Sequence, residues 1–106
     1  MAYYDLKRSG AQYMFNLRGD NNETVLTSER YTTKQSAENG INSVRVNAPE
    51  DARYSRLTST SGSPYFTLKA ANGETLGTSE TYSSAQARDV GIAWTKRNAP
   101  GAPVKD

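Results

Sequence analysis

Two stretches of this chain read alike without a gap: FNLRGDNNETVLTSERYTTKQSAENGINSVRVNAP (residues 15–49) and FTLKAANGETLGTSETYSSAQARDVGIAWTKRNAP (residues 66–100). The shift between them is 51 residues, and 15 of the 35 paired positions are identical. A sequence that repeats at a fixed period is built from repeated structural units. The register therefore predicts two equivalent units before any local propensity is weighed.

The chain has 106 residues, which suits one compact domain. Each copy has only about fifty residues, and a unit of that size buries too thin a core to be stable alone. We therefore predict one domain over residues 1–106 in which the two copies share a core and pair within a monomer, as an intramolecular pseudo-dimer. Its parts are repeat one, repeat two and a loose tail, at about 2–50, 53–100 and 101–106.

A first strand is predicted at the start of each copy, because side chains of alternating character run through Leu6. The 51-residue shift places Leu57 under Leu6 and Tyr54 under Tyr3, so the counterpart strand is expected at 53–58.

The second strand has the clearest alternation, with Tyr13, Phe15 and Leu17 on one face and Phe66 and Leu68 as the counterparts. A tight turn follows in both copies. Asn-Gly at 72–73 is typical of a type I′ turn, which needs positive φ at both central residues, and Asn-Asn stands at 21–22. Third strands are expected beyond the turns, at 24–29 and 75–80.

The period then becomes helical, and helices are predicted at 33–46 and 84–97. Thr32 and Ser83, each followed three residues later by glutamine, form possible capping boxes. Asn47 and Asn98 suit left-handed helix ends, and the prolines that follow forbid continuation. In the first helix the apolar stripe consists of Ala37, Ile41, Val44 and Ala48.

Gly40 and Gly91 lie at the same mid-helix position, where glycine costs about 1 kcal/mol relative to alanine. Close approach of each helix to the sheet or to the other helix explains that cost; inheritance through duplication is the alternative. The fold class that follows is α+β: tandem β-β-β-α repeats forming one shared antiparallel sheet, with two helices on one face.

The repeated pattern resembles the YegP-like family of small bacterial proteins. The resemblance rests on Asn-Gly-Glu at 72–74, Thr-Ser-Glu-x-Tyr at 27–31 and 78–82, and Gly-Ile-Asn-Ser-Val at 40–44. It covers nearly the whole chain in two copies, and the second copy departs from it at residues 93–95. It implies an α+β fold of tandem three-strand-plus-helix units with a strand exchanged between them, and it carries over no catalytic residues.

Histidine and cysteine are both absent. The chain thus lacks the commonest general base and metal ligand, and any thiol nucleophile. The repeated carboxylates are Glu23 with Glu74, which follow turns, and Glu29 with Glu80, which precede helices and favour the helix dipole. We therefore expect no enzyme activity, no catalytic residue, no metal site and no cofactor.

No apolar run reaches membrane-spanning length, and the first ten residues lack the pattern of a secretory signal. The expected location is the cytoplasm, with no membrane partner.

Two sets of repeated side chains could bind a partner. Tyr31 and Tyr82 close the third strands, either as half-buried rings with wet hydroxyls or as ligand-stacking rings. Basic side chains occupy matched strand and late-helix positions, which permits weak nucleic-acid binding but also complements the helix dipole: Arg18, Lys69, Arg45, Lys96 and Arg97.

The function expected from these observations is that of a non-enzymatic cytoplasmic binding module, with a protein as the partner and weak polyanion binding as the alternative. The copies differ most where Trp94 replaces Ser43 and Thr95 replaces Val44. The asymmetric helix region is therefore the place where we expect a specific partner.

Overall fold

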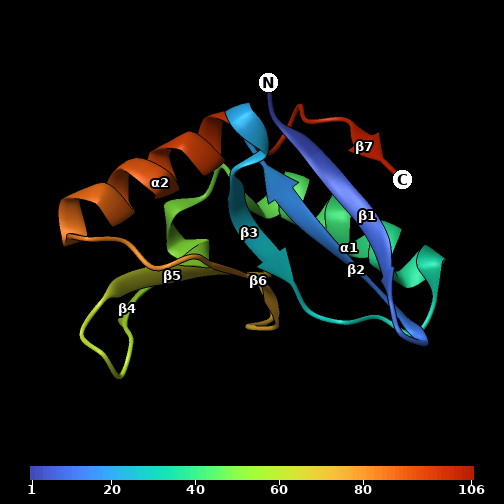
Figure 1. Ribbon diagram of the computed structural model, residues 1–106, viewed down its shortest axis with the longest axis horizontal. Helices are drawn as coiled ribbons and strands as arrows, with labels where there is room; N and C mark the ends of the chain where they lie inside the picture. Colours follow the sequence, from blue (N-terminus) through green and yellow to red (C-terminus); the bar gives the residue numbers. More distant parts are fainter.

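The computed structural model describes residues 1–106 and contains one seven-stranded sheet and two long helices (Figure 1). Two short 3-10 helices, η1 and η2, complete it. Across the sheet the strand order is β4-β5-β6-β3-β2-β1-β7. In chain order the elements are β1 (Tyr3–Ser9), β2 (Gln12–Arg18), η1 (Asp20–Asn22), β3 (Thr24–Ser28), α1 (Lys34–Asn47), η2 (Asp51–Arg53), β4 (Tyr54–Thr58), β5 (Pro64–Lys69), β6 (Thr75–Ser79), α2 (Ala85–Asn98) and β7 (Val104–Lys105).

The two copies meet where β3 pairs with β6 in antiparallel register. Thr27 lies opposite Thr78, and these two residues are equivalent under the 51-residue shift. Antiparallel neighbours of this kind are related by a local twofold axis perpendicular to the sheet, which places both helices on the same face. The predicted α+β fold is confirmed: six strands form a shared antiparallel sheet, and each copy supplies three strands and a helix.

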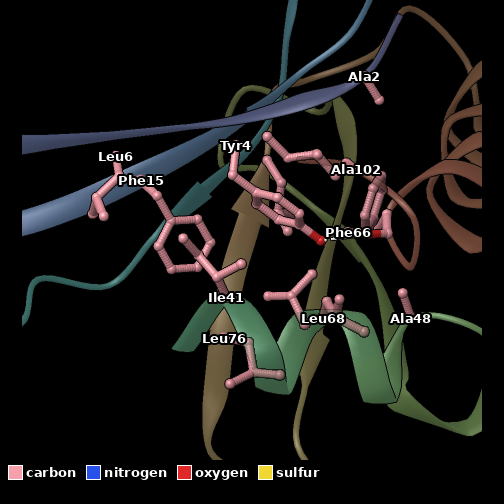
Figure 2. Close-up of a cluster of buried hydrophobic side chains, with 14 of the residues drawn as sticks. Ala2, Tyr4, Leu6, Phe15, Ile41, Ala48, Phe66, Leu68, Leu76 and Ala102 are labelled. Atoms are coloured by element: carbon pink, nitrogen blue, oxygen red, sulfur yellow. Dashed lines mark hydrogen bonds between the residues drawn. The ribbon is translucent and has the colours of Figure 1, made fainter. Parts of the chain in front are cut away.

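The core is shared between the copies. One cluster of 17 buried hydrophobic residues includes side chains from both halves of the chain. Figure 2 shows Phe15 of β2 pointing toward Ile41 of α1, while Phe66 and Leu68 of β5 lie over the same helix. Neither copy therefore closes a core without the other, as the small size of each copy predicted.

The register of the first strands differs from the prediction. Tyr4 pairs with Leu17 in the first copy, and Tyr54 pairs with Leu68 in the second, so Tyr54 is the counterpart of Tyr4. The offset in this strand is therefore 50 residues instead of 51, because the hairpin of the second copy holds one extra residue between the paired positions Tyr54 and Leu68. The prediction that Leu57 lies under Leu6 was wrong, and Leu57 is exposed.

The predicted type I′ turn occurs in the first copy only. Asn21 and Asn22 have φ of 62° and 60°, so both central residues are left-handed. In the second copy only Gly73 has positive φ, and its N–H bonds the carbonyl of Ala70, so the turn is set one residue earlier. The prediction for Asn72 was therefore wrong: the two copies use different turns at the same place.

The helices begin one residue later than predicted. Thr33 and Ser84 are the N-caps, and their hydroxyl oxygens accept hydrogen bonds from main-chain N–H groups three residues on. The capping boxes at Thr32 and Ser83 were wrong, because each glutamine falls one position short of the N3 site that the box requires.

The helix ends also differ from the prediction. Asn47 and Asn98 are right-handed last residues of their helices, and their side-chain amides donate to main-chain carbonyls four residues back. The predicted left-handed caps at these asparagines were wrong. Ala48 and Ala99 follow as right-handed caps, and the prolines after them end the helices.

The tail is ordered. Val104 and Lys105 form β7, which pairs in parallel with β1, and the N–H of Tyr4 donates to the carbonyl of Pro103 at 2.8 Å. Ala102 is buried in the core, and Figure 1 shows β7 beside β1 near the N-terminus. The prediction of a loose tail was wrong because its local composition carries no signal of contacts made nearly a hundred residues away.

Two equivalent positions beside the twofold axis hold different residues, a leucine and a glycine. Leu26 and Gly77 are equivalent positions on adjacent strands, and both lie on the helix-facing side near the axis. A Cβ atom on Gly77 would lie 2.6 Å from Cγ of Leu26, well inside van der Waals contact. One leucine therefore fills the space at the axis, and the second copy leaves room for it.

Candidate binding groove

Each helix carries a tyrosine ring over its central glycine. A Cβ atom on Gly40 would overlap the hydroxyl of Tyr31 and lie 2.7 Å from its Cζ atom; the Cζ atom of Tyr82 would be 2.8 Å from a Cβ on Gly91. The close approach predicted for both glycines is confirmed, and the contacting group is the tyrosine that ends the third strand. The rings of Tyr31 and Tyr82 are half-buried, which was one of the two possibilities that the sequence left open.

A second pair of tyrosines joins the copies. The Tyr4 hydroxyl donates to the Ala99 carbonyl at 2.7 Å, and the Tyr54 hydroxyl donates to the Ala48 carbonyl at 2.7 Å. Each bond runs from a strand of one copy to the C-cap of the other copy's helix. Burial raises the pKa of both tyrosines well above the ordinary value. The ungapped repeat hid this pair, and allowing one inserted residue in the alignment reveals it.

A groove of about 550 Å³ lies between the β2–β3 turn of the first copy and α2 of the second. We call it the Trp94 groove. The turn contributes Gly19, Asp20, Asn21 and Glu23; β3 contributes Val25; α2 contributes Ala87, Val90, Gly91 and Trp94; Tyr82 completes the lining. A site of this volume is in the range that binds small ligands or a few side chains of a peptide.

Two large apolar residues of α2, Trp94 and Val90, line the groove, but only Trp94 packs against the rest of the protein. Trp94 is held by the turn, since a Cβ on Gly19 would lie 3.0 Å from the indole Cζ2 atom. Val90 has no such partner and remains 63% exposed. Single exposed apolar side chains are common, but this one is contiguous with an indole ring in a concave surface, which is typical of a binding site.

The other copy has no equivalent apolar wall. The residues equivalent to Ala87, Val90 and Trp94 are all polar: Ser36, Asn39 and Ser43. A smaller hollow lies at the corresponding place, with a volume of about 400 Å³ and one hydrophobic residue in its lining. We call it the Tyr31 hollow; it is lined by Glu29, Arg30, Tyr31, Glu74 and Thr75. The copies have thus diverged on the surface that faces this site.

The divergence at Thr95 has a different cause. Thr95 and its counterpart Val44 are both fully buried, and the Thr95 hydroxyl donates to the Gly91 carbonyl at 2.8 Å. This difference lies in the core and presents nothing to a partner. Of the two sequence differences singled out, only the one at Trp94 reaches the surface of the groove.

The hydroxyls of Tyr31 and Tyr82 each lie near a glutamate of the other copy. Burial, with smaller contributions from the charges of Glu23 and Glu80, raises the pKa of the Tyr82 hydroxyl. Burial raises the pKa of Tyr31 in the same way, with Glu74 and Glu29 as the charged neighbours. Both hydroxyls are therefore neutral near pH 7 and can donate a hydrogen bond. Sequence separation alone could not show that each tyrosine faces a glutamate of the other copy.

The repeated Thr-Ser-Glu motif has a structural role through its serine. Ser28 accepts a hydrogen bond from the N–H of Phe15 at 2.9 Å and donates to the Glu29 carbonyl at 2.7 Å. Ser79 makes the same two bonds in the second copy. The carboxylates of Glu29 and Glu80 make no hydrogen bond to a helix N–H, so the capping contact expected of them is absent. No group of three or more carboxylates comes together as a metal site.

Three of the five basic positions are engaged inside the chain. Arg18 lies 3.0 Å from a carboxylate oxygen of Asp5. Arg45 donates to a main-chain carbonyl of the tail at 2.7 Å, and Lys96 lies 2.6 Å from a carboxylate oxygen of Asp51. The other two positions, Lys69 and Arg97, make no ion pair. Two of the five positions are thus paired with carboxylates, and nucleic-acid binding stays a prediction.

Neither helix has the length and hydropathy that crossing a membrane requires.

Comparison with known proteins agrees with this architecture. A family model described as a domain of unknown function, DUF1508, matches twice, at residues 9–55 and 59–106. The chain belongs to the DUF1508 family. The two matches cover nearly the whole DUF1508 chain and correspond to its two copies, so the resemblance to YegP-like proteins is confirmed.

Relatives of this DUF1508 chain align with it over more than nine-tenths of their length. It is 64% identical to a UPF0339 protein of Bordetella pertussis over 104 residues, which is 98% of this chain and 94% of that protein. It is 50% identical over 100 residues to UPF0339 protein YegP of Escherichia coli strain K12, covering 94% and 91% of the two chains. The solution NMR structure of UPF0339 protein SO3888 from Shewanella oneidensis superposes with a TM-score of 0.92, at 45% identity over 99% of this chain and 90% of that one.

Proposed function

We propose that this DUF1508 protein is a non-enzymatic cytoplasmic binding module that receives a segment of a partner protein in the Trp94 groove. One observation carries the proposal: Ala87, Val90 and Trp94 form an apolar wall where the other copy has polar residues. The cytoplasmic location is the expectation that the sequence provides.

The exposed part of the apolar wall contributes little to folding if nothing covers it. An exposed valine in a hollow gains nothing from folding, and an asparagine at the equivalent position of the first copy is compatible with the same helix. Interfaces are enriched in tryptophan, and such rings in concave sites are frequent centres of binding energy. A partner that buries Val90 and the free part of the Trp94 ring explains why these residues stand there.

The proposal is tested by capture of partners from the cells that make the protein, followed by mass spectrometry. The variants are Trp94→Ser and Val90→Asn, each of which installs the residue of the other copy. Val46→Ser is the matched control, because Val46 is 74% exposed on α1 outside the groove. We expect a specific protein that wild type and the control retain and that both groove variants lose.

Retention of the same proteins by all four forms would overturn the proposal. Val90→Asn should not lose binding through misfolding, because Val90 is exposed. Asparagine already occupies the equivalent exposed position, Asn39, in the helix of the first copy. Thermal unfolding by circular dichroism establishes that each variant is folded before capture.

A further inference from the structure

The charged groups of the Trp94 groove have one sign. Its two charged lining residues are Asp20 and Glu23, and no lysine or arginine lines it. The chain as a whole has a net charge of +2, so the sign at this site is opposite to that of the molecule. An acidic site on a basic protein favours the cationic part of a ligand, because charges across an interface are complementary.

The two carboxylates are not equally available. Asp20 contacts the amino group of Met1. Glu23 makes no ion pair within the chain, is exposed and lines the groove from the β2–β3 turn. Glu23 is therefore the carboxylate most ready to pair with a cation from outside.

The apolar and acidic parts of the groove lie on different elements. Val90 and Trp94 belong to α2, whereas Glu23 belongs to the β2–β3 turn on the opposite side. A ligand that fills the groove must therefore carry an apolar group and a cationic group close together. The indole ring adds attraction for a cation placed over its face.

We propose that the partner segment is both apolar and basic: an aliphatic side chain packs on Val90 and Trp94, and a neighbouring arginine or lysine pairs with Glu23. This inference rests on the proposed function and adds the chemistry of the partner. The protein supplies a neutral donor as well, the Tyr82 hydroxyl, which makes no hydrogen bond within the chain and suits a main-chain carbonyl of the segment.

The Tyr31 hollow serves as an internal comparison. It retains Glu74, the counterpart of Glu23, but no residue of α1 lines it, and it has no apolar wall. A ligand that required only a carboxylate would bind both sites, whereas an apolar basic segment binds the Trp94 groove alone. The proposal therefore predicts one segment bound per chain.

The test uses the full chain labelled with nitrogen-15. The probe is the peptide acetyl-Gly-Leu-Arg-Leu-Gly-amide, with a twin that has glutamate in place of arginine and another with serine in place of both leucines. The chain has one tryptophan, so a single indole N–H resonance reports on the groove. We expect the basic peptide to shift this resonance and the amide resonances of Gly19 and Val90. It should bind up to about fivefold more tightly than the glutamate twin, as one partly exposed ion pair permits, and more tightly than the serine twin, which buries less apolar surface.

Charge reversal locates the cation. Glu23→Lys is expected to remove the preference for arginine over glutamate, while the matched variant Glu74→Lys leaves it unchanged. Both residues are exposed, so neither change threatens the fold. Equal loss in the two variants would place the cation elsewhere and overturn the inference.

Other outcomes are equally decisive. Equal affinity for the arginine and glutamate peptides, or no shift with any peptide, would overturn the inference that the partner segment is basic. A partner captured through Trp94 would still support the proposed function. Tryptamine binding as tightly as the peptide would identify a small amine as the occupant. Shifts that appear on concentrating the protein alone would identify a second copy. Either result would overturn the inference that a peptide segment occupies the groove.

Discussion

A core substitution at the axis between the copies tests the fold most directly. Gly77 faces the fully buried side chain of Leu26, and the three atoms nearest to an added Cβ all belong to that leucine, at 2.6, 2.8 and 3.2 Å. In Gly77→Ala the leucine must move by on the order of 1 Å, which is overpacking that costs about 1–3 kcal/mol. Removing a strand glycine returns about 0.5–1 kcal/mol. We expect a net loss of about 1–2 kcal/mol in the free energy of unfolding.

The same substitution should behave differently when the leucine is truncated. Leu26→Ala alone costs about 2–5 kcal/mol through the cavity that it leaves. With alanine at 26, a methyl group at 77 meets open space, so adding Gly77→Ala is expected to be neutral or to stabilise by up to about 1 kcal/mol. The coupling energy between the two sites is then about 1–3 kcal/mol, in the range found for residues in direct contact.

The assay is urea unfolding of the wild type, both single variants and the double variant, followed by circular dichroism with a common slope. Leu6→Ala replaces Leu26→Ala in the control cycle, because Leu6 is buried on β1, three strands away from Gly77. The control cycle should be additive within about 0.5 kcal/mol. An additive result in the Leu26 cycle as well would refute the argument that the glycine stands there to admit the leucine.

Three further predictions concern single contacts. Thr33→Ala removes the N-cap of α1 and should cost about 1 kcal/mol in urea unfolding, whereas Thr32→Ala should cost much less; a larger effect at Thr32 would restore the capping box. Gly40→Ala should lower the free energy of unfolding by about 1–2 kcal/mol, because overlap with the tyrosine ring outweighs the helix propensity of alanine; a stabilised variant in the same assay would contradict the packing. Burial raises the pKa of Tyr4 and Tyr54, so the folded chain keeps protons that the unfolded chain releases at about pH 10. Stability should hold below that pH and fall above it in urea midpoints measured from about pH 8 to 11.5, and a flat profile would contradict the burial.

The sequence predicted those parts of the fold whose signals are local. The helix stripe at Ala37, Ile41 and Val44 is fully buried, as its spacing requires. The second and third strands of each copy, the presence of the two helices and the shared core were also predicted correctly. Helix ends were not, because threonine stands at both 32 and 33, and composition alone does not choose between adjacent hydroxyls.

Long-range features needed the structure. Nothing near Gly40 in the sequence names Tyr31 as the group above it, and an ungapped repeat concealed the pairing of Tyr4 with Tyr54 behind a one-residue loop difference. The groove combines a turn of one copy with a helix of the other, so no window of sequence contains it. The one signal available was the exchange of Ser43 for Trp94, which pointed to the correct helix without the turn that faces it.

The pairing of β3 with β6 has a consequence for how such a protein responds to dilution. In an assembly of two separate copies this pairing would obey mass action, and every substitution would occur on both sides of the axis. Here residues 49–53 connect the copies. The effective concentration that one copy presents to the other therefore stays in the range of about millimolar, whatever the concentration of the protein. A tether also lets one side change alone: Leu26 can face Gly77, and one copy can carry a tryptophan where the other keeps serine. Covalent linkage is thus what makes a single, unsymmetrical surface attainable in a molecule built from two similar halves.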